Sequence, residues 1–121
     1  MSIRLKVRRD DPLEDGSYRA LLRSLEKKET TFGERLMWLF EATEHNAEVA
    51  GFTSLSESTM ANAYLWATAL NAEIRSKVSW GPEDVVGREC ILDLTIVEDS
   101  KGREKNKIMR VRPASKDENN S

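Results

Sequence analysis

Residues 85–113 limit most strongly what this chain can fold into. An apolar run rich in β-branched residues leads to a polar turn at 99–102 that contains Gly102, and a second run over 105–112 follows. Two such runs around a short glycine-containing turn predict an antiparallel hairpin. A hairpin at this end of the chain favours a mainly β domain.

The two arms of this hairpin carry opposite charges. Residues 83–99 contain six acids and one arginine, and residues 101–116 contain seven cations and one acid, although the whole chain has a net charge of −2. Such an asymmetry can steer a charged partner towards one side of a molecule. Two interpretations stay open: two solvated strands whose charges attract each other, and a basic surface that binds a polyanion.

Three more strands are predicted in the first half of the chain. The first starts after Gly16 and runs towards residue 28, and a turn at 29–33 separates it from a strongly apolar second strand over 35–43. A weaker third strand over 47–55 contains Gly51, which predicts a bulge or bend. The period then changes, because apolar residues over 60–74 follow the i, i+3, i+4, i+7 spacing of one helix face.

The helix has candidate signals at both ends. Ser56 or Ser58 can cap its start, and the sequence Trp80-Gly81-Pro82 ends it. Three strands, a helix and two strands is the element order of the OB-fold, a five-stranded, partly open barrel with the helix between strands 3 and 4. An α+β fold with one helix on an open sheet is the alternative. We expect an N-terminal arm over 1–15, one domain over 16–114 and a disordered tail over 115–121.

The second predicted strand is apolar on both faces. Its even-numbered residues Leu36, Trp38 and Phe40 share one face, and Met37 and Leu39 lie on the other. Whichever face points inwards, apolar side chains remain outside, and a soluble protein covers such a patch with its own chain, a ligand or a partner. All three options stay open, and so does the register of the strand.

Three segments resemble a known family. They are Gly16-Ser17-Tyr18-Arg19-Ala20, the run from Gly33-Glu34-Arg35-Leu36 into Phe40-Glu41, and Val86-Gly87-Arg88-Glu89-Cys90 followed by 102–108. Together they resemble small phage- and prophage-encoded proteins of unknown function that are thought to be OB-fold proteins of replication or recombination modules. The resemblance implies binding of single-stranded DNA. The turn at 43–46 is acidic and lacks the glycines usual in that family, so it is not a candidate for phosphate contact.

Single-stranded nucleic acid is held by cations along its backbone and by aromatic rings under its bases. In an OB-fold, strands 2 and 3 and the loops joining strands 1–2 and 4–5 form the binding surface. Both of these loops are basic here, and one carries an aromatic ring. The predicted phosphate contacts are Lys27, Lys28, Arg35, Lys101, Arg103, Lys105 and Lys107, and the predicted stacking residues are Phe32 and Trp38.

The main alternative is a module that binds a protein partner or forms a homo-oligomer through Met37, Leu39 and Trp80. Replication or recombination proteins are the expected partners, and a nuclease-like or oligosaccharide-binding OB protein is a further possibility.

An enzyme is not expected. The only histidine, His45, has no neighbours that build a nucleophile triad, and no Cys/His cluster for zinc is present. We therefore expect no catalytic residue, metal or cofactor. The only cysteine, Cys90, lies in an apolar strand, which predicts a buried, inert thiol. The chain shows neither a signal peptide nor a membrane span, so the cytoplasm is the expected compartment.

Overall fold

The computed structural model describes residues 12–114, where five antiparallel strands form one sheet. Of the predicted arm over residues 1–15, residues 1–11 lie outside the described residues, and so does the predicted tail over 115–121. Within the described part, no helix has the length and apolar character needed to cross a membrane. The elements are β1 (Gly16–Thr30), β2 (Gly33–Ala42), β3 (Ala47–Thr53), α1 (Asn62–Leu70), the 3-10 helix η1 (Ala72–Ser76), α2 (Pro82–Val85), β4 (Glu89–Glu98) and β5 (Glu104–Pro113).

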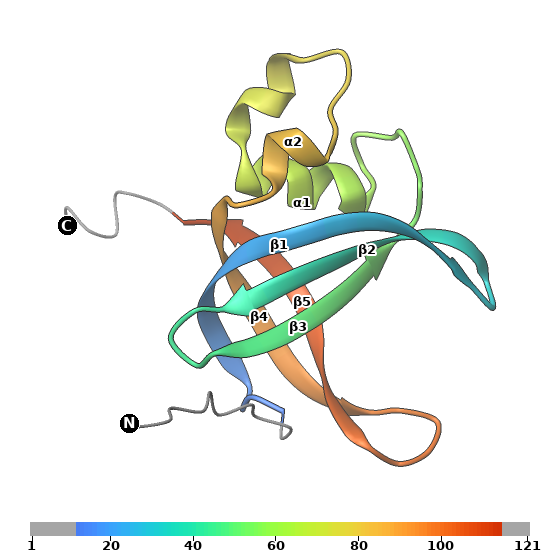
Figure 1. The fold of residues 1–121 in the computed structure, drawn as a ribbon, viewed down its shortest axis with the longest axis vertical. Helices are drawn as coiled ribbons and strands as arrows, with labels where there is room; N and C mark the ends of the chain where they lie inside the picture. Colours follow the sequence, from blue (N-terminus) through green and yellow to red (C-terminus); the bar gives the residue numbers. More distant parts are fainter. Residues whose placement is uncertain (1–11, 115–121) are drawn as a thin grey trace, which may run out of the picture.

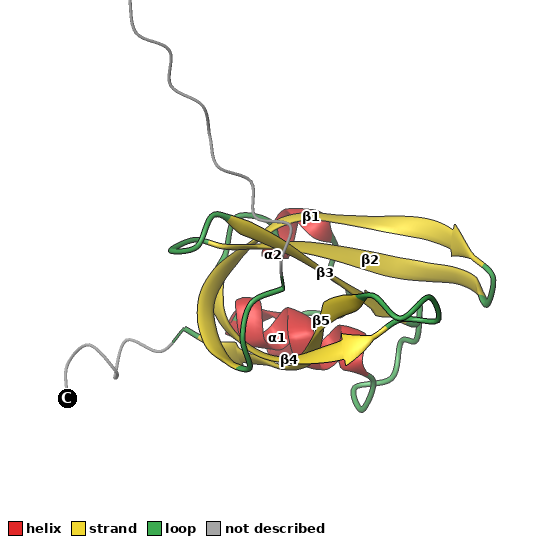
Figure 2. Ribbon diagram, turned by 90° about the horizontal axis from the view of Figure 1, so that it is seen from below, coloured by secondary structure: helices red, strands yellow, loops and turns green. Residues whose placement is uncertain are grey.

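The strands are arranged in the order β3-β2-β1-β4-β5, with β1 at the centre. β1 is long enough to pair with β4 through its first residues and with β2 through the rest, and the register shifts between Leu22 and Ser24. This irregularity bends the strand. The sheet curves strongly, so that the edge strands β3 and β5 come near each other (Figures 1 and 2) although they are not hydrogen-bonded neighbours.

The core lies on the inner face of this curved sheet, and α1 packs against it. Trp66 of α1 meets Trp38 edge-on, with 5.4 Å between ring centroids, and lies 6.1 Å from the ring of Phe40. Gly51 allows this close packing, because a Cβ there would lie 2.8 Å from both Trp66 and Ile108 of β5. The predicted bulge at Gly51 is wrong: the pairing of β2 with β3 runs through it without a shift.

The predicted helix over 60–74 is divided into α1 and η1. The division falls at Asn71, whose backbone is extended and whose side chain accepts a hydrogen bond from the Glu73 amide and donates one to the carbonyl of Asp84. The predicted serine cap is wrong, because Ala61 is at the N-cap and makes no side-chain hydrogen bond. The hydroxyl of Ser58 accepts from Met60 instead and shapes the loop before the helix.

The strand predictions are confirmed in number and order. β1 begins at Gly16, one residue before the predicted start, and the turn between β4 and β5 falls at 99–103. The residues just before β1 are packed: Leu13 is buried, and its backbone exchanges two hydrogen bonds with the side chain of Asn106 on β5. These bonds tie the start of the domain to its last hairpin.

Candidate functional site

Two hairpin tips project from the same side of the molecule, at the right of Figures 1 and 2. We call residues 27–35 the β1–β2 tip and residues 99–107 the β4–β5 tip. The pairing of β2 with β3 ends at Leu36, so the β1–β2 tip extends beyond the sheet as a two-stranded ribbon. Basic residues predicted from the sequence lie on both tips.

The β1–β2 tip carries cations on both of its faces. Lys28 lies opposite Arg35, whereas Lys27 lies opposite Leu36, so the two neighbouring lysines point to opposite sides of the ribbon. Both lysines are exposed, and within residues 12–114 no acid forms an ion pair with either. Phe32 at the turn is 82% exposed, and the guanidinium of Arg35 lies 5.7 Å from the centre of its ring. The tip thus presents an open aromatic ring beside Arg35, together with two exposed lysines and with two exposed acids, Glu29 and Glu34, that lie opposite each other.

The β4–β5 tip is organised by one acid. The carboxylate of Asp99 accepts hydrogen bonds from the amides of Lys101 and Arg103, at 2.9 and 3.0 Å, and from Nε of Arg103 at 3.2 Å. These backbone amides lower the pKa of Asp99 below its ordinary value. Arg103 is therefore engaged within its own turn. Lys105 and Lys107 lie opposite Val97 and Thr95 and are exposed.

The outer face of β2 and β3 carries an apolar patch. Met37 lies opposite Phe52, and Leu39 lies opposite Ala50. Met37 and Leu39 are half-buried, and Phe52 is 48% exposed. We call Met37, Leu39, Ala50 and Phe52 the outer patch. It continues directly into the pair of Lys28 and Arg35 at the base of the β1–β2 tip.

Trp38 lies on the opposite side of β2 and is 0% exposed. Its Nε1 donates a hydrogen bond of 2.9 Å to the hydroxyl of Thr53, and its ring is parallel to that of Phe40. No face of this ring is open to a base, so the prediction that Trp38 stacks on a base is wrong. Phe52 was not among the predicted contacts. The signal for it is the alternation of buried and exposed residues along β3, which puts Glu48, Ala50 and Phe52 outside.

The three predicted partner-interface residues are not brought together. Met37 and Leu39 belong to the outer patch, whereas Trp80 packs against the core from the inner side, with its ring centre 6.0 Å from that of Trp38. Trp80 instead lines a groove between the β1–β2 tip and the helices. The structure therefore separates one predicted interface into two surfaces.

The remaining cations of β5 are held by Asp93 on β4. Arg112 donates two hydrogen bonds of 2.9 Å to the Asp93 carboxylate, Arg110 donates one of 3.3 Å, and the hydroxyl of Ser17 donates a fourth at 2.6 Å. Arg112 above all lowers the pKa of Asp93, to about 2. This cluster joins β1, β4 and β5 and neutralises part of the basic arm.

Two further features bear on the chemistry of the described residues. Burial raises the pKa of the Cys90 thiol to about 12, so it stays protonated at neutral pH, and its predicted burial is confirmed. Among residues 12–114, no three His, Cys, Asp or Glu side chains are grouped so that they could hold a metal ion.

The sequence matches no known family model, and no curated protein is similar enough to it to be a relative.

Proposed function

We propose that this chain is a non-catalytic, sequence-tolerant single-stranded-DNA-binding protein of OB type, which acts as a cytoplasmic accessory to replication or recombination. The observation that carries the proposal is the pair of cationic tips on one side of the curved sheet, together with the outer patch on strands β2 and β3. The resemblance to phage and prophage proteins points to the same ligand.

The strand order supports an OB-type barrel. β1 pairs with both β2 and β4, a helix lies between β3 and β4 in the chain, and the edge strands β3 and β5 are near each other. These features are those expected of an OB-fold, a five-stranded, partly open Greek-key barrel whose ligand crosses strands 2 and 3. The outer patch lies on these two strands.

Binding would combine two kinds of contact. Exposed cations with no ion-pair partner in residues 12–114 would neutralise phosphates: these are Lys27, Lys28, Lys101, Lys105 and Lys107. Phe32 and Phe52 would stack on bases, and neither ring has to leave the core to do so. Arg35 would guide the backbone past Phe32. Arg103 is a weaker contact because Asp99 already holds its guanidinium.

The test is a titration of a fluorescently labelled oligonucleotide at increasing salt. Each phosphate contact on a single strand contributes about −0.7 to the slope of log K against log salt, so the five lysines predict a steep loss of affinity. A duplex of the same sequence should bind more weakly, because its bases are not open to Phe32 and Phe52. An affinity that does not change with salt would contradict the proposed phosphate contacts.

The alternative is an interaction module, favoured by the exposure of Phe52 within an apolar patch. Charge reversal at Lys101, Lys105 and Lys107 should abolish DNA binding without changing the size of the protein in solution. Polar substitution of Met37 and Leu39 should change the oligomeric size if the patch binds a second copy. The opposite pattern, in which only the patch variants lose function, would favour the interaction module.

A further inference from the structure

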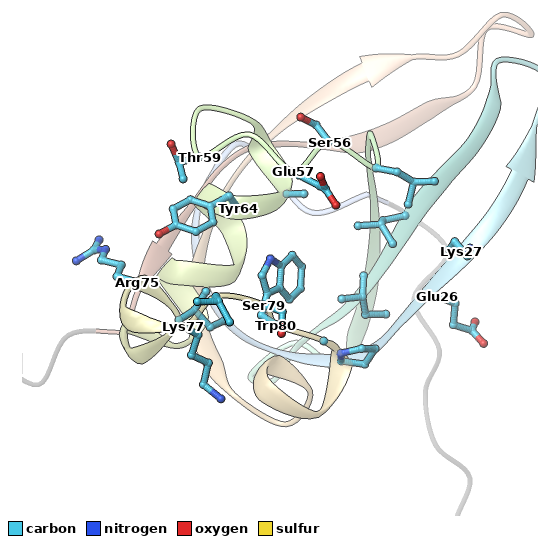
Figure 3. Close-up of a pocket in the computed structure, with 18 residues that line it drawn as sticks. Glu26, Lys27, Ser56, Glu57, Thr59, Tyr64, Arg75, Lys77, Ser79 and Trp80 are labelled. Carbon is cyan, nitrogen blue, oxygen red and sulfur yellow. The ribbon is translucent and has the colours of Figure 1, made fainter.

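A groove of about 690 Å³ lies between the β1–β2 tip and the helical segments, on the side of the tip opposite the outer patch. Leu25 and Leu36 line it from the strands. Tyr64 lines it from α1, and Trp80 lines it from the segment before α2 (Figure 3). The volume falls within the range of binding sites for small organic ligands. The groove is separate from the proposed DNA-binding surface, which consists of the two hairpin tips and the outer patch. The groove and that surface share only the β1–β2 tip.

The groove has an aromatic wall backed by the core. Trp80 is half-buried, and behind it lies the fully buried ring of Trp38, with 6.0 Å between the ring centres. In Figure 3 the indole of Trp80 lies in the middle of the groove, between Tyr64 on the helix side and the strands. A ring supported in this way offers a flat surface at little entropic cost.

The charges around the groove leave a small excess of cations. Lys27 and Arg75 have no ion-pair partner within residues 12–114, and the acid Glu57 lines the groove with them. Glu26 also borders the groove, but it lies opposite Met37, on the face of the outer patch. The third cation, Lys77, is bound at 2.9 Å to Asp84, which neutralises it. The apolar lining by Leu25, Leu36 and Trp80 favours an uncharged flat ring over a phosphate inside the groove. The phosphate of the same nucleotide, joined to the base through the sugar, would lie beside Lys27 at the edge of the groove.

We propose that this groove holds one unpaired base of the DNA strand, stacked on Trp80, with its phosphate beside Lys27. The inference rests on the proposed function and adds a specific base site to it. The β1–β2 tip would then lie between two parts of the ligand, with Lys28 and Arg35 on the side of the outer patch and Lys27 on the side of the groove.

Lys27 and Lys28 provide a matched pair for the test. They are adjacent, exposed and equal in charge, and they differ in the face of the ribbon to which they point. The readout is tryptophan fluorescence during titration with a short unlabelled oligonucleotide, because Trp38 and Trp66 are buried and Trp80 is the most accessible tryptophan. Affinity is measured separately by the anisotropy of a labelled oligonucleotide.

We expect DNA to quench the wild-type emission and Trp80→Phe to lose most of this quenching. Lys27→Ala should also lose most of it, whereas Lys28→Ala should keep it at saturating DNA. Trp80→Leu, checked for folding by circular dichroism, should weaken binding about tenfold, which corresponds to about 1.4 kcal/mol for one lost stack.

The failures of the two proposals can be told apart. DNA binding in the anisotropy assay without quenching, or equal loss of quenching in both lysine variants, would overturn the groove assignment and leave the proposed function standing. The absence of DNA binding in both assays would overturn both proposals. Quenching that depends on protein concentration without DNA would assign the groove to a second copy of the chain and also overturn the base site.

Discussion

The two faces of β2 differ sharply although their residues alternate along one strand. On the inner face, Trp38 and Phe40 are 0% exposed, and both meet Trp66 of α1. On the outer face, Met37 and Leu39 are only half-buried and lie beside the exposed ring of Phe52. Inner residues gain their contacts on folding, whereas outer residues still have apolar surface that a ligand can cover. Similar apolar residues in one strand are thus used up in the core on one side and left partly open to solvent on the other, where we propose that a ligand binds.

The largest expected effect is on the inner face. Phe40→Ala should lower the free energy of unfolding by about 3–5 kcal/mol, because it removes a buried ring and leaves a cavity against Trp66. Denaturation by urea, followed by circular dichroism, measures this change. Leu39→Ala, one residue away on the outer face, should cost much less. Equal losses for the two variants would break the proposed division between the faces.

The next effect separates recognition from stability on the outer face. Phe52→Ala should weaken binding of single-stranded DNA by about 1–3 kcal/mol, the range for loss of one base–aromatic stack. The free energy of unfolding should change by about 0.5 kcal/mol or less, as for most surface substitutions. Phe52→Tyr keeps an aromatic ring and should bind nearly as well as the wild type. An unchanged affinity in Phe52→Ala would mean that the outer patch does not touch the ligand.

The number and order of the strands could be predicted from the sequence because strand alternation and turn residues are local signals. The choice of face in β2 could not, since residues 36–40 are apolar on both sides and only the packing of Trp66 decides which side is inside. The end of α1 was missed for a similar reason. Asn71 leaves the helical conformation with help from a hydrogen bond to Asp84, thirteen residues further along the chain.

The candidate site follows the same rule. Exposed cations at turns, such as Lys28, can be found from sequence because turns lie on the surface. Which cations are already neutralised cannot be found that way. Arg103 is held by Asp99 in its own turn, but Arg110 and Arg112 meet Asp93 only because β4 and β5 pair in one particular register.

The ion pairs of Asp93 with Arg110 and Arg112 are expected to stabilise the fold. Asp93→Asn should lower the free energy of unfolding at neutral pH by about 1 kcal/mol, since its partners Arg110 and Arg112 lose a partly exposed carboxylate. The folded-state pKa of Asp93, about 2, lies below the unfolded value, so its contribution is full above about pH 4 and is lost as the pH falls towards 2. Unfolding curves of both proteins should therefore converge in acid. A difference that stays constant down to pH 2 would contradict the ion pair.

The smallest expected effect compares a free cation with a neutralised one. Lys28→Ala should reduce the steepness of the salt dependence of DNA binding by about 0.7, which corresponds to one lost phosphate contact. Arg110 is also exposed, but it donates a hydrogen bond to Asp93, so Arg110→Ala should change the slope less. Anisotropy titrations at four or more salt concentrations resolve this difference. Equal changes for the two variants would show that the ion pair with Asp93 opens on binding, and the set of phosphate contacts would then extend along the whole of β5.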